Sequence, residues 1–181
     1  WPPVRVQGLW KVPFSEKPLG ADCLTISANN VGGPKGIGAV NIGPRVGNQK
    51  PRLAGGGQEG GLRAGTEATA KFAGFARAVE LRRENLEEKL LCMAKIRDYA
   101  AERLSAIPDL KILSAPGGAP HILSISLVGW PSQNIVNDLG SQGVCTSAGS
   151  ACHQGKHSHV IAALKLSKKV SDGVIRLSFG P

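Results

Sequence analysis

Apolar residues recur at three- and four-residue steps between Glu67 and Leu104, which is the spacing of one face of an α-helix. Thr66 is placed to cap the start of this helix, with Glu67 in its first turn, and Pro108 lies beyond its end. The pattern predicts one long amphipathic helix or two helices end to end. Its apolar positions are Phe72, Phe75, Val79, Leu86, Leu90, Met93, Ile96, Ala100 and Leu104.

Short apolar runs bounded by Gly and Pro predict strands on both sides of this helix. Two such runs, at residues 22–27 and 37–42, come before it. The later part of the chain is expected to hold strands at 110–113, 121–128, near 144 and at 174–179, and helices at 132–139 and 160–166, the second capped by Ser158. Strands and helices in this order after a long connecting helix predict an α/β sandwich.

The composition is that of a globular protein. A chain of 181 residues with 41% hydrophobic content can bury a sizeable core. No apolar run approaches the roughly 18 residues of a membrane span, and no basic-then-apolar leader opens the chain. The four cysteines are sparse and form no CxxC pair, which argues against a disulfide scaffold or a zinc site. We therefore expect free thiols, no metal, no membrane segment and a cytoplasmic location.

The charge is strongly basic but dispersed. Lys and Arg number 22 against 13 Asp and Glu, which gives a formal net charge of +9. Between residues 87 and 103 the basic side chains alternate with acidic ones, as on a solvated helix face. Few aromatic residues are present to stack on bases, so nucleic-acid binding is not expected. A general anion-binding module would rest on the charge alone.

Residues 55–66 form a glycine-rich loop that runs toward the predicted helix start. Exposed amides at a helix N-terminus, with the hydroxyl of Thr66 and the cation of Arg63, suit a phosphate or a carboxylate. A flexible linker between domains would have the same composition, and the loop by itself does not decide between the two interpretations.

Cys152 lies in a segment of small residues followed by cationic and polar ones, at residues 147–156. His153, Lys156 and His157 would favour the thiolate form of a partly exposed cysteine, although most loop cysteines are inert. Cys145, by contrast, lies in a strand-like stretch and is expected in the core.

Arg176 is flanked by apolar residues of a predicted strand. Its planar guanidinium suits a carboxylate, and the alternative is an arginine that simply faces solvent. His121 is expected to be structural, and His157 and His159 to be solvated or capping.

Taken together, these stretches resemble the NifS/IscS-type cysteine desulfurases. These are homodimeric pyridoxal-phosphate (PLP) enzymes that convert L-cysteine to L-alanine and leave a persulfide on a loop cysteine. The resemblance runs from about Val6 to Gly180 and covers only the C-terminal half of a complete family member. Five motifs carry the resemblance, and their order and spacing together make it specific. They are residues 19–22 (LGAD), 33–38 (GPKGIG), 55–66, 147–152 (SAGSAC) and 176–178 (RLS).

The resemblance implies roles for individual residues. Cys152 matches the persulfide-forming nucleophile, and Arg176 matches the arginine that binds the substrate α-carboxylate. Thr66 matches a residue that reaches the PLP phosphate of a neighbouring subunit, which implies a dimer, and Gln7 matches the glutamine that hydrogen-bonds the phenolic oxygen of PLP. The implied fold is that of the type I PLP-dependent transferases. Residues 1–66 would end the large domain, 67–104 would form the connecting helix, and 105–181 would form the small α/β domain.

The cofactor positions depart from the family pattern. The Ser-x-His-Lys tetrad of the family reads Ser27-Ala28-Asn29-Asn30 here, so Asn30 replaces the lysine that forms the Schiff base, and Lys35 is no obvious substitute. The family aspartate that contacts the pyridinium nitrogen is replaced by Val4, which would make the ring a poorer electron sink. Ser27, Asn29 and Asn30 remain the expected cofactor-lining positions. We predict that this chain by itself neither holds PLP covalently nor desulfurates cysteine.

Three functional interpretations follow from the resemblance. The first is a cysteine desulfurase that delivers sulfur to an acceptor protein for iron–sulfur cluster or thio-cofactor assembly, either as a homodimer or paired with a separate N-terminal half. The second is a catalytically inactive remnant, or an interaction module that relays a persulfide through Cys152. The third is a selenocysteine lyase, because sulfur and selenium substrates share the same carboxylate contact.

Overall fold

The computed structural model describes residues 8, 10–12, 22–46, 49–51, 53–149 and 158–180. Gln7 and Cys152, two of the predicted site residues, lie outside the described residues. The chain divides into two compact units, Trp1–Leu86 and Glu87–Pro181. Among the helices described, none is both long and apolar enough to cross a bilayer.

The first unit contains a two-stranded antiparallel sheet. Strand β1 (Cys23–Ser27) pairs with β2 (Gly38–Ile42), and the register places Ser27 opposite Gly38. A Cβ atom at Gly38 would lie 2.4 Å from the carbonyl oxygen of Ile26, so the close approach of the strands there requires glycine. The 3₁₀ helix η2 (Ala28–Val31) follows β1 directly and ends at Gly32, whose φ of 85° suits a residue without a side chain.

Helix α1 (Thr69–Arg83) and the 3₁₀ helix η3 (Gln58–Gly61) complete this unit. α1 packs closely against the turn after η2, because a Cβ atom at Gly74 would lie 2.8 Å from Cγ of Pro34. Thr66 does not cap the helix, so that prediction is wrong: the N-cap is Ala68, which makes no side-chain capping bond. The backbone N–H of Thr69 instead donates to the carbonyl of Glu67, and the helix begins two residues later than expected.

The long helical pattern is divided into two helices, which was one of the two predicted outcomes. α1 ends before Glu84, whose backbone is extended, and Asn85 adopts a φ of 51°. Helix α2 (Leu86–Ser105) follows. Asparagine tolerates the left-handed region better than most residues, so the break falls where the sequence allows it.

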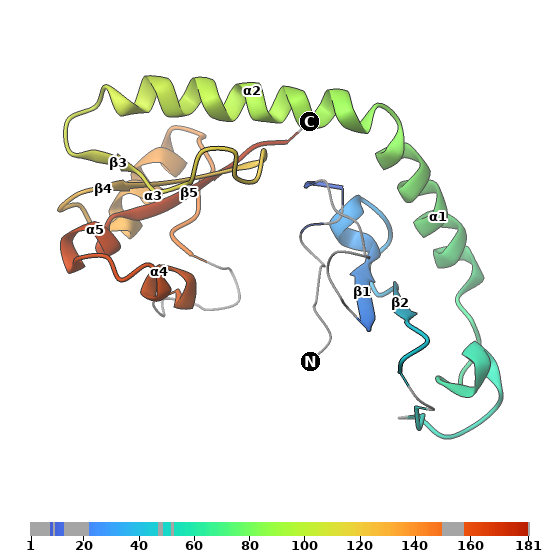
Figure 1. The fold of residues 1–181 in the computed structure, drawn as a ribbon. Coiled ribbons are helices and arrows are strands. Elements are labelled where there is room, and N and C mark those ends of the chain that lie inside the picture. The colour runs from blue at the N-terminus through green and yellow to red at the C-terminus, as the bar shows by residue number, and fades with distance from the viewer. Residues whose placement is uncertain are drawn as a thin grey trace. The chain divides into compact units, whose positions relative to one another are not determined.

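The second unit is built on a three-stranded antiparallel sheet with the order β3-β4-β5. The strands are β3 (Leu110–Ile112), β4 (Ile122–Leu127) and β5 (Val174–Ser178). One face of the sheet forms the core, where Leu123, Ile125 and Ile175 are at most 4% exposed. Residues of α2 and of α3 (Ser132–Ser141) pack against this face, and Figure 1 shows α2 running along it.

The opposite face of the sheet carries α4 (His159–Ala163) and α5 (Lys168–Asp172). Ser126 of β4 is fully buried there, and its hydroxyl donates to the carbonyl of Val170 at 2.6 Å. Because side chains alternate between the faces of a strand, Ser124 and Arg176 share this second face with Ser126. The sheet thus separates an apolar core from a face with polar side chains.

Two sequence predictions in this unit are wrong. No strand forms at Val144, and the segment joins the sheet only at an isolated bridge between Ser147 and Arg176. Cys145 is consequently exposed and not part of the core. Ser158 does take the N-cap position of α4, but its side chain makes no capping hydrogen bond.

Candidate functional site

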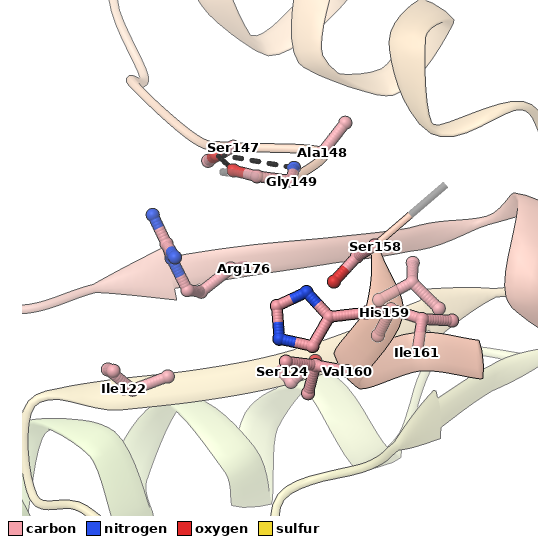
Figure 2. Close-up of a pocket in the computed structure, with 11 residues that line it drawn as sticks. Ile122, Ser124, Ser147, Ala148, Gly149, Ser158, His159, Val160, Ile161 and Arg176 are labelled. Atoms are coloured by element: carbon pink, nitrogen blue, oxygen red, sulfur yellow. Dashed lines mark hydrogen bonds between the residues drawn. The ribbon is translucent and has the colours of Figure 1, made fainter. Parts of the chain in front are cut away.

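A pocket of about 300 Å³ lies on the second face of the sheet in the second unit. Figure 2 shows that its walls come from β4, β5, the segment before residue 150 and the start of α4. Its lining is mainly small, aliphatic or hydroxyl-bearing: Ile122, Ser124, Ser147, Ala148, Gly149, Ser158, His159, Val160, Ile161, Val174 and Arg176.

Arg176 is held on the pocket side of β5 by backbone pairing on both of its edges. It lies opposite Ser124 in the β4 register, and its N–H donates to the carbonyl of Ser147 at 2.7 Å. The N–H of Ser147 donates back to the carbonyl of Arg176 at 3.2 Å. Arg176 is exposed and forms no ion pair with any described residue. Its fork of donors is therefore positioned to receive an anion that enters the pocket.

The segment that carries Cys152 joins the described structure at this pocket on both sides. Gly149 and Ser158, the described residues that flank positions 150–157, both line the pocket. A small turn fixes the first end: the Ser147 hydroxyl donates to the carbonyl of Gly149, and the Gly149 N–H lies 3.4 Å from the same hydroxyl oxygen. Figure 2 shows this turn above Arg176.

His159 also lines the pocket, and sequence reasoning gave it no place there. It is the first residue of α4, and Figure 2 shows its imidazole reaching into the pocket beside Ser158. Nothing in the local sequence distinguishes it from His157, two residues earlier. Only the packing of α4 against the sheet shows that this imidazole shares a cavity with Arg176.

The predicted cofactor residues Ser27, Asn29 and Asn30 lie together in the first unit, at the end of β1 and in η2. The Ser27 hydroxyl donates to the side-chain oxygen of Asn29, so these two polar groups bind each other. Asn29 is exposed and Asn30 is half-buried. In the same unit, partial burial and, secondarily, the charge of Arg82 lower the pKa of Lys11.

The glycine-rich loop at residues 55–66 is folded around η3. Glu59, Gly60 and Gly61 have positive φ angles of 52°, 64° and 80°. The N–H of Gly65 donates to the side-chain oxygen of Gln58 at 3.4 Å, and Thr66 is exposed. The loop therefore makes internal hydrogen bonds before α1 begins.

Comparison with known proteins places the whole chain in one family. The model of the aminotransferase class-V family matches residues 5–181. The cysteine desulfurase IscS of Clostridium botulinum is 34% identical over 184 residues, covering 97% of this chain and 45% of its own. A cysteine desulfurase of Trichormus azollae is 35% identical over 177 residues, covering 96% and 44%.

Solved structures give the same result. A NifS-like protein superimposes with a TM-score of 0.81 at 31% identity, over 97% of this chain and 45% of its own. The NifS-like protein of Rickettsia africae gives 0.83 at 28% identity, over 98% and 47%. The chain thus spans about half the length of the relatives it matches, as expected for a C-terminal half, and the fold is that of the type I PLP-dependent proteins.

The family match supports PLP as the cofactor, but the described residues do not fit its covalent attachment. Position 30 carries a carboxamide, which is not a nucleophilic amine, and the neighbouring Ser27 and Asn29 bind each other. Lys35, on the turn that follows η2, is exposed. These findings confirm the resemblance read from the sequence: the chain belongs to the aminotransferase class-V family, where it is similar to the C-terminal half of the cysteine desulfurases.

Proposed function

We propose that this chain is the sulfur-accepting half of a cysteine desulfurase. The observation that carries the proposal is the pocket of the second unit, which is lined by Arg176 and by both residues that flank the Cys152 segment. A carboxylate-binding cation and a nucleophilic thiol on one cavity are what sulfur transfer from an amino acid requires.

Arg176 would bind the α-carboxylate of L-cysteine. Backbone pairing to two neighbouring segments holds its strand in place, so the guanidinium starts from a fixed point on the pocket wall. The strong, bidentate pairing of guanidinium with carboxylate would fix the substrate's orientation.

Cys152 would accept the sulfur. It is three residues from Gly149, so covalent geometry keeps its Cα within about 11 Å of that pocket residue. The net change is the transfer of one sulfur atom: L-cysteine and the Cys152 thiol give L-alanine and a Cys152 persulfide. An acceptor protein, in iron–sulfur cluster or thio-cofactor assembly, would then take the outer sulfur.

The remaining cofactor contacts would come from outside the second unit. Gln7 and Thr66 would contact PLP. Thr66 would reach the PLP phosphate of a neighbouring subunit, in a homodimer or in an assembly with a separate N-terminal half. Because position 30 lacks an amine, the lysine needed to cleave the carbon–sulfur bond must come from elsewhere, and the chain by itself would release no alanine. The two curated relatives compared are both named cysteine desulfurases, so neither the selenocysteine lyase nor the inactive remnant gains support.

We also propose a division of the chain into domains and a cellular compartment. Residues 1–66 would complete the large domain, 67–104 would connect the domains, and 105–181 would form the small domain. A persulfide-forming thiol must stay reduced, which favours the cytoplasm. Cys23, Cys92 and Cys145 are free thiols, in keeping with such a compartment.

The test is reconstitution of the two halves. The chain carrying Asn30→Lys, which restores the amine at position 30, is combined with PLP, L-cysteine and the N-terminal half of the Clostridium botulinum relative, and alanine release and persulfide-bearing peptides are measured. We expect a persulfide at Cys152. The Cys152→Ser variant should lose it, and the control variant Cys145→Ser, changed at an exposed cysteine, should keep it. The chain alone should release no alanine.

A second measurement does not depend on assembly of the halves. The chain is treated with a low-molecular-weight persulfide, and labelling of each cysteine is mapped. Preferential labelling of Cys152 supports the proposal, and equal labelling of Cys92, Cys145 and Cys152 contradicts it.

A further inference from the structure

The described lining of the pocket holds basic side chains but no acidic one. Among the described residues that line it, only Arg176 and His159 carry ionisable side chains, and none is acidic. An ammonium group in this cavity would find no counterion on the lining, whereas a carboxylate would find a guanidinium. The lining therefore favours the anionic end of an amino acid.

The two side chains come from different walls. Arg176 extends from β5, and His159 extends from the first residue of α4. Figure 2 shows the guanidinium and the imidazole directed into the same cavity, with Ser158 beside the imidazole. Both groups are N–H donors: guanidinium donates only, and a neutral imidazole still has one N–H.

Resting on the proposed function, we propose that His159 donates a second hydrogen bond to the substrate carboxylate bound by Arg176. His159 is then a specificity-determining residue of the pocket. A carboxylate held by one exposed arginine can pivot about that contact. A second donor from another wall fixes its plane and so orients the rest of the amino acid.

The ligand class follows from this geometry. The site should take small α-amino acids through the carboxylate, and it should reject analogues in which that group is an uncharged amide. L-alanine, the product of the proposed reaction, and L-alaninamide form a matched pair that differs only in this respect.

The experiment titrates the ¹⁵N-labelled full chain with L-alanine and, separately, with L-alaninamide, and follows the amide signals by NMR. We expect L-alanine alone to shift signals of pocket residues. His159→Ala should raise the Kd for L-alanine about tenfold, the usual cost of a lost hydrogen bond to a charged group. His159→Gln, which keeps an N–H donor, should stay within about threefold of the wild type. Leu164→Ala, an exposed residue just beyond α4, is the matched control and should leave the Kd unchanged.

The outcomes separate this inference from the proposed function. If Arg176→Ala abolishes binding but His159→Ala does not weaken it, the role of His159 is refuted and the arginine site stands. If the wild type does not bind L-alanine, or binds it equally without Arg176, the carboxylate site fails and the inference fails with it. If His159→Ala weakens binding only together with a large fall in melting temperature, and Gln does not rescue it, His159 is a packing residue and the inference is overturned.

Discussion

Asn30 stands where the resemblance implies the lysine that forms the Schiff base in the cysteine desulfurases. The strand and 3₁₀ helix that position it are intact: β1 ends at Ser27, and η2 begins with the fully buried Ala28. The local backbone at this position is therefore well formed, and it presents a carboxamide. An amine introduced at this position should meet a formed site.

We predict that Asn30→Lys makes the chain reactive toward PLP at residue 30. Position 30 is half-buried, whereas Asn29 is exposed, and burial lowers the pKa of an amine and leaves more of it uncharged and nucleophilic. Borohydride-fixed pyridoxyl groups, mapped on peptides, should therefore be several times more abundant at residue 30 than at residue 29 in the control Asn29→Lys. Equal labelling of the two variants would show that η2 does not provide a distinct environment.

At the scale of elements, the sheet of the second unit depends on both of its faces. The core face is apolar and packs against α2 and α3, while the other face attaches α5 through a buried polar contact. α5 was not predicted from the sequence, because a five-residue helix that begins Lys168-Lys169 has almost no periodic pattern. Its attachment point, Ser126, is nevertheless as buried as any core residue.

We predict that Ser126→Ala lowers the free energy of unfolding by about 1–2 kcal/mol, because it leaves the buried carbonyl of Val170 without its hydroxyl donor. Ser105→Ala is the matched control: its hydroxyl also donates to a backbone carbonyl, that of Glu102, but at an exposed site. The control should change stability by less than about 0.5 kcal/mol. Urea unfolding gives the free energy of unfolding of both variants. Equal losses of stability in the two variants would show that burial of the hydrogen bond does not matter.

At the scale of the whole molecule, strand β2 is exposed at all five of its positions. Val40 is 59% exposed, and among the described strands β2 pairs only with β1. Isolated two-stranded sheets are marginal in water, and an exposed apolar edge is a template for pairing with another chain. The same edge would be available to the remaining half of the family fold.

We predict that the chain self-associates in solution through β2. Val40→Lys should reduce the associated fraction severalfold, because a charged edge residue opposes strand pairing. Val144→Lys places the same charge at another exposed valine, outside the strands, and should have little effect. Sedimentation velocity at several concentrations provides the measurement, and a monodisperse wild-type monomer would count against the prediction.

The sequence by itself determined the elements and the family. Periodicity and turn residues are local, so β1, β2, β4, β5 and α3 were predicted to within about two residues, and the spaced motifs identified the family. The tertiary structure alone decided which side chains share a cavity. The Ser147–Arg176 bridge and the packing of α4 join segments distant in the chain, and they place His159 and Arg176 on the lining of one pocket and leave Cys145 exposed. Such contacts form only when the whole sheet folds, so a local sequence pattern does not predict them.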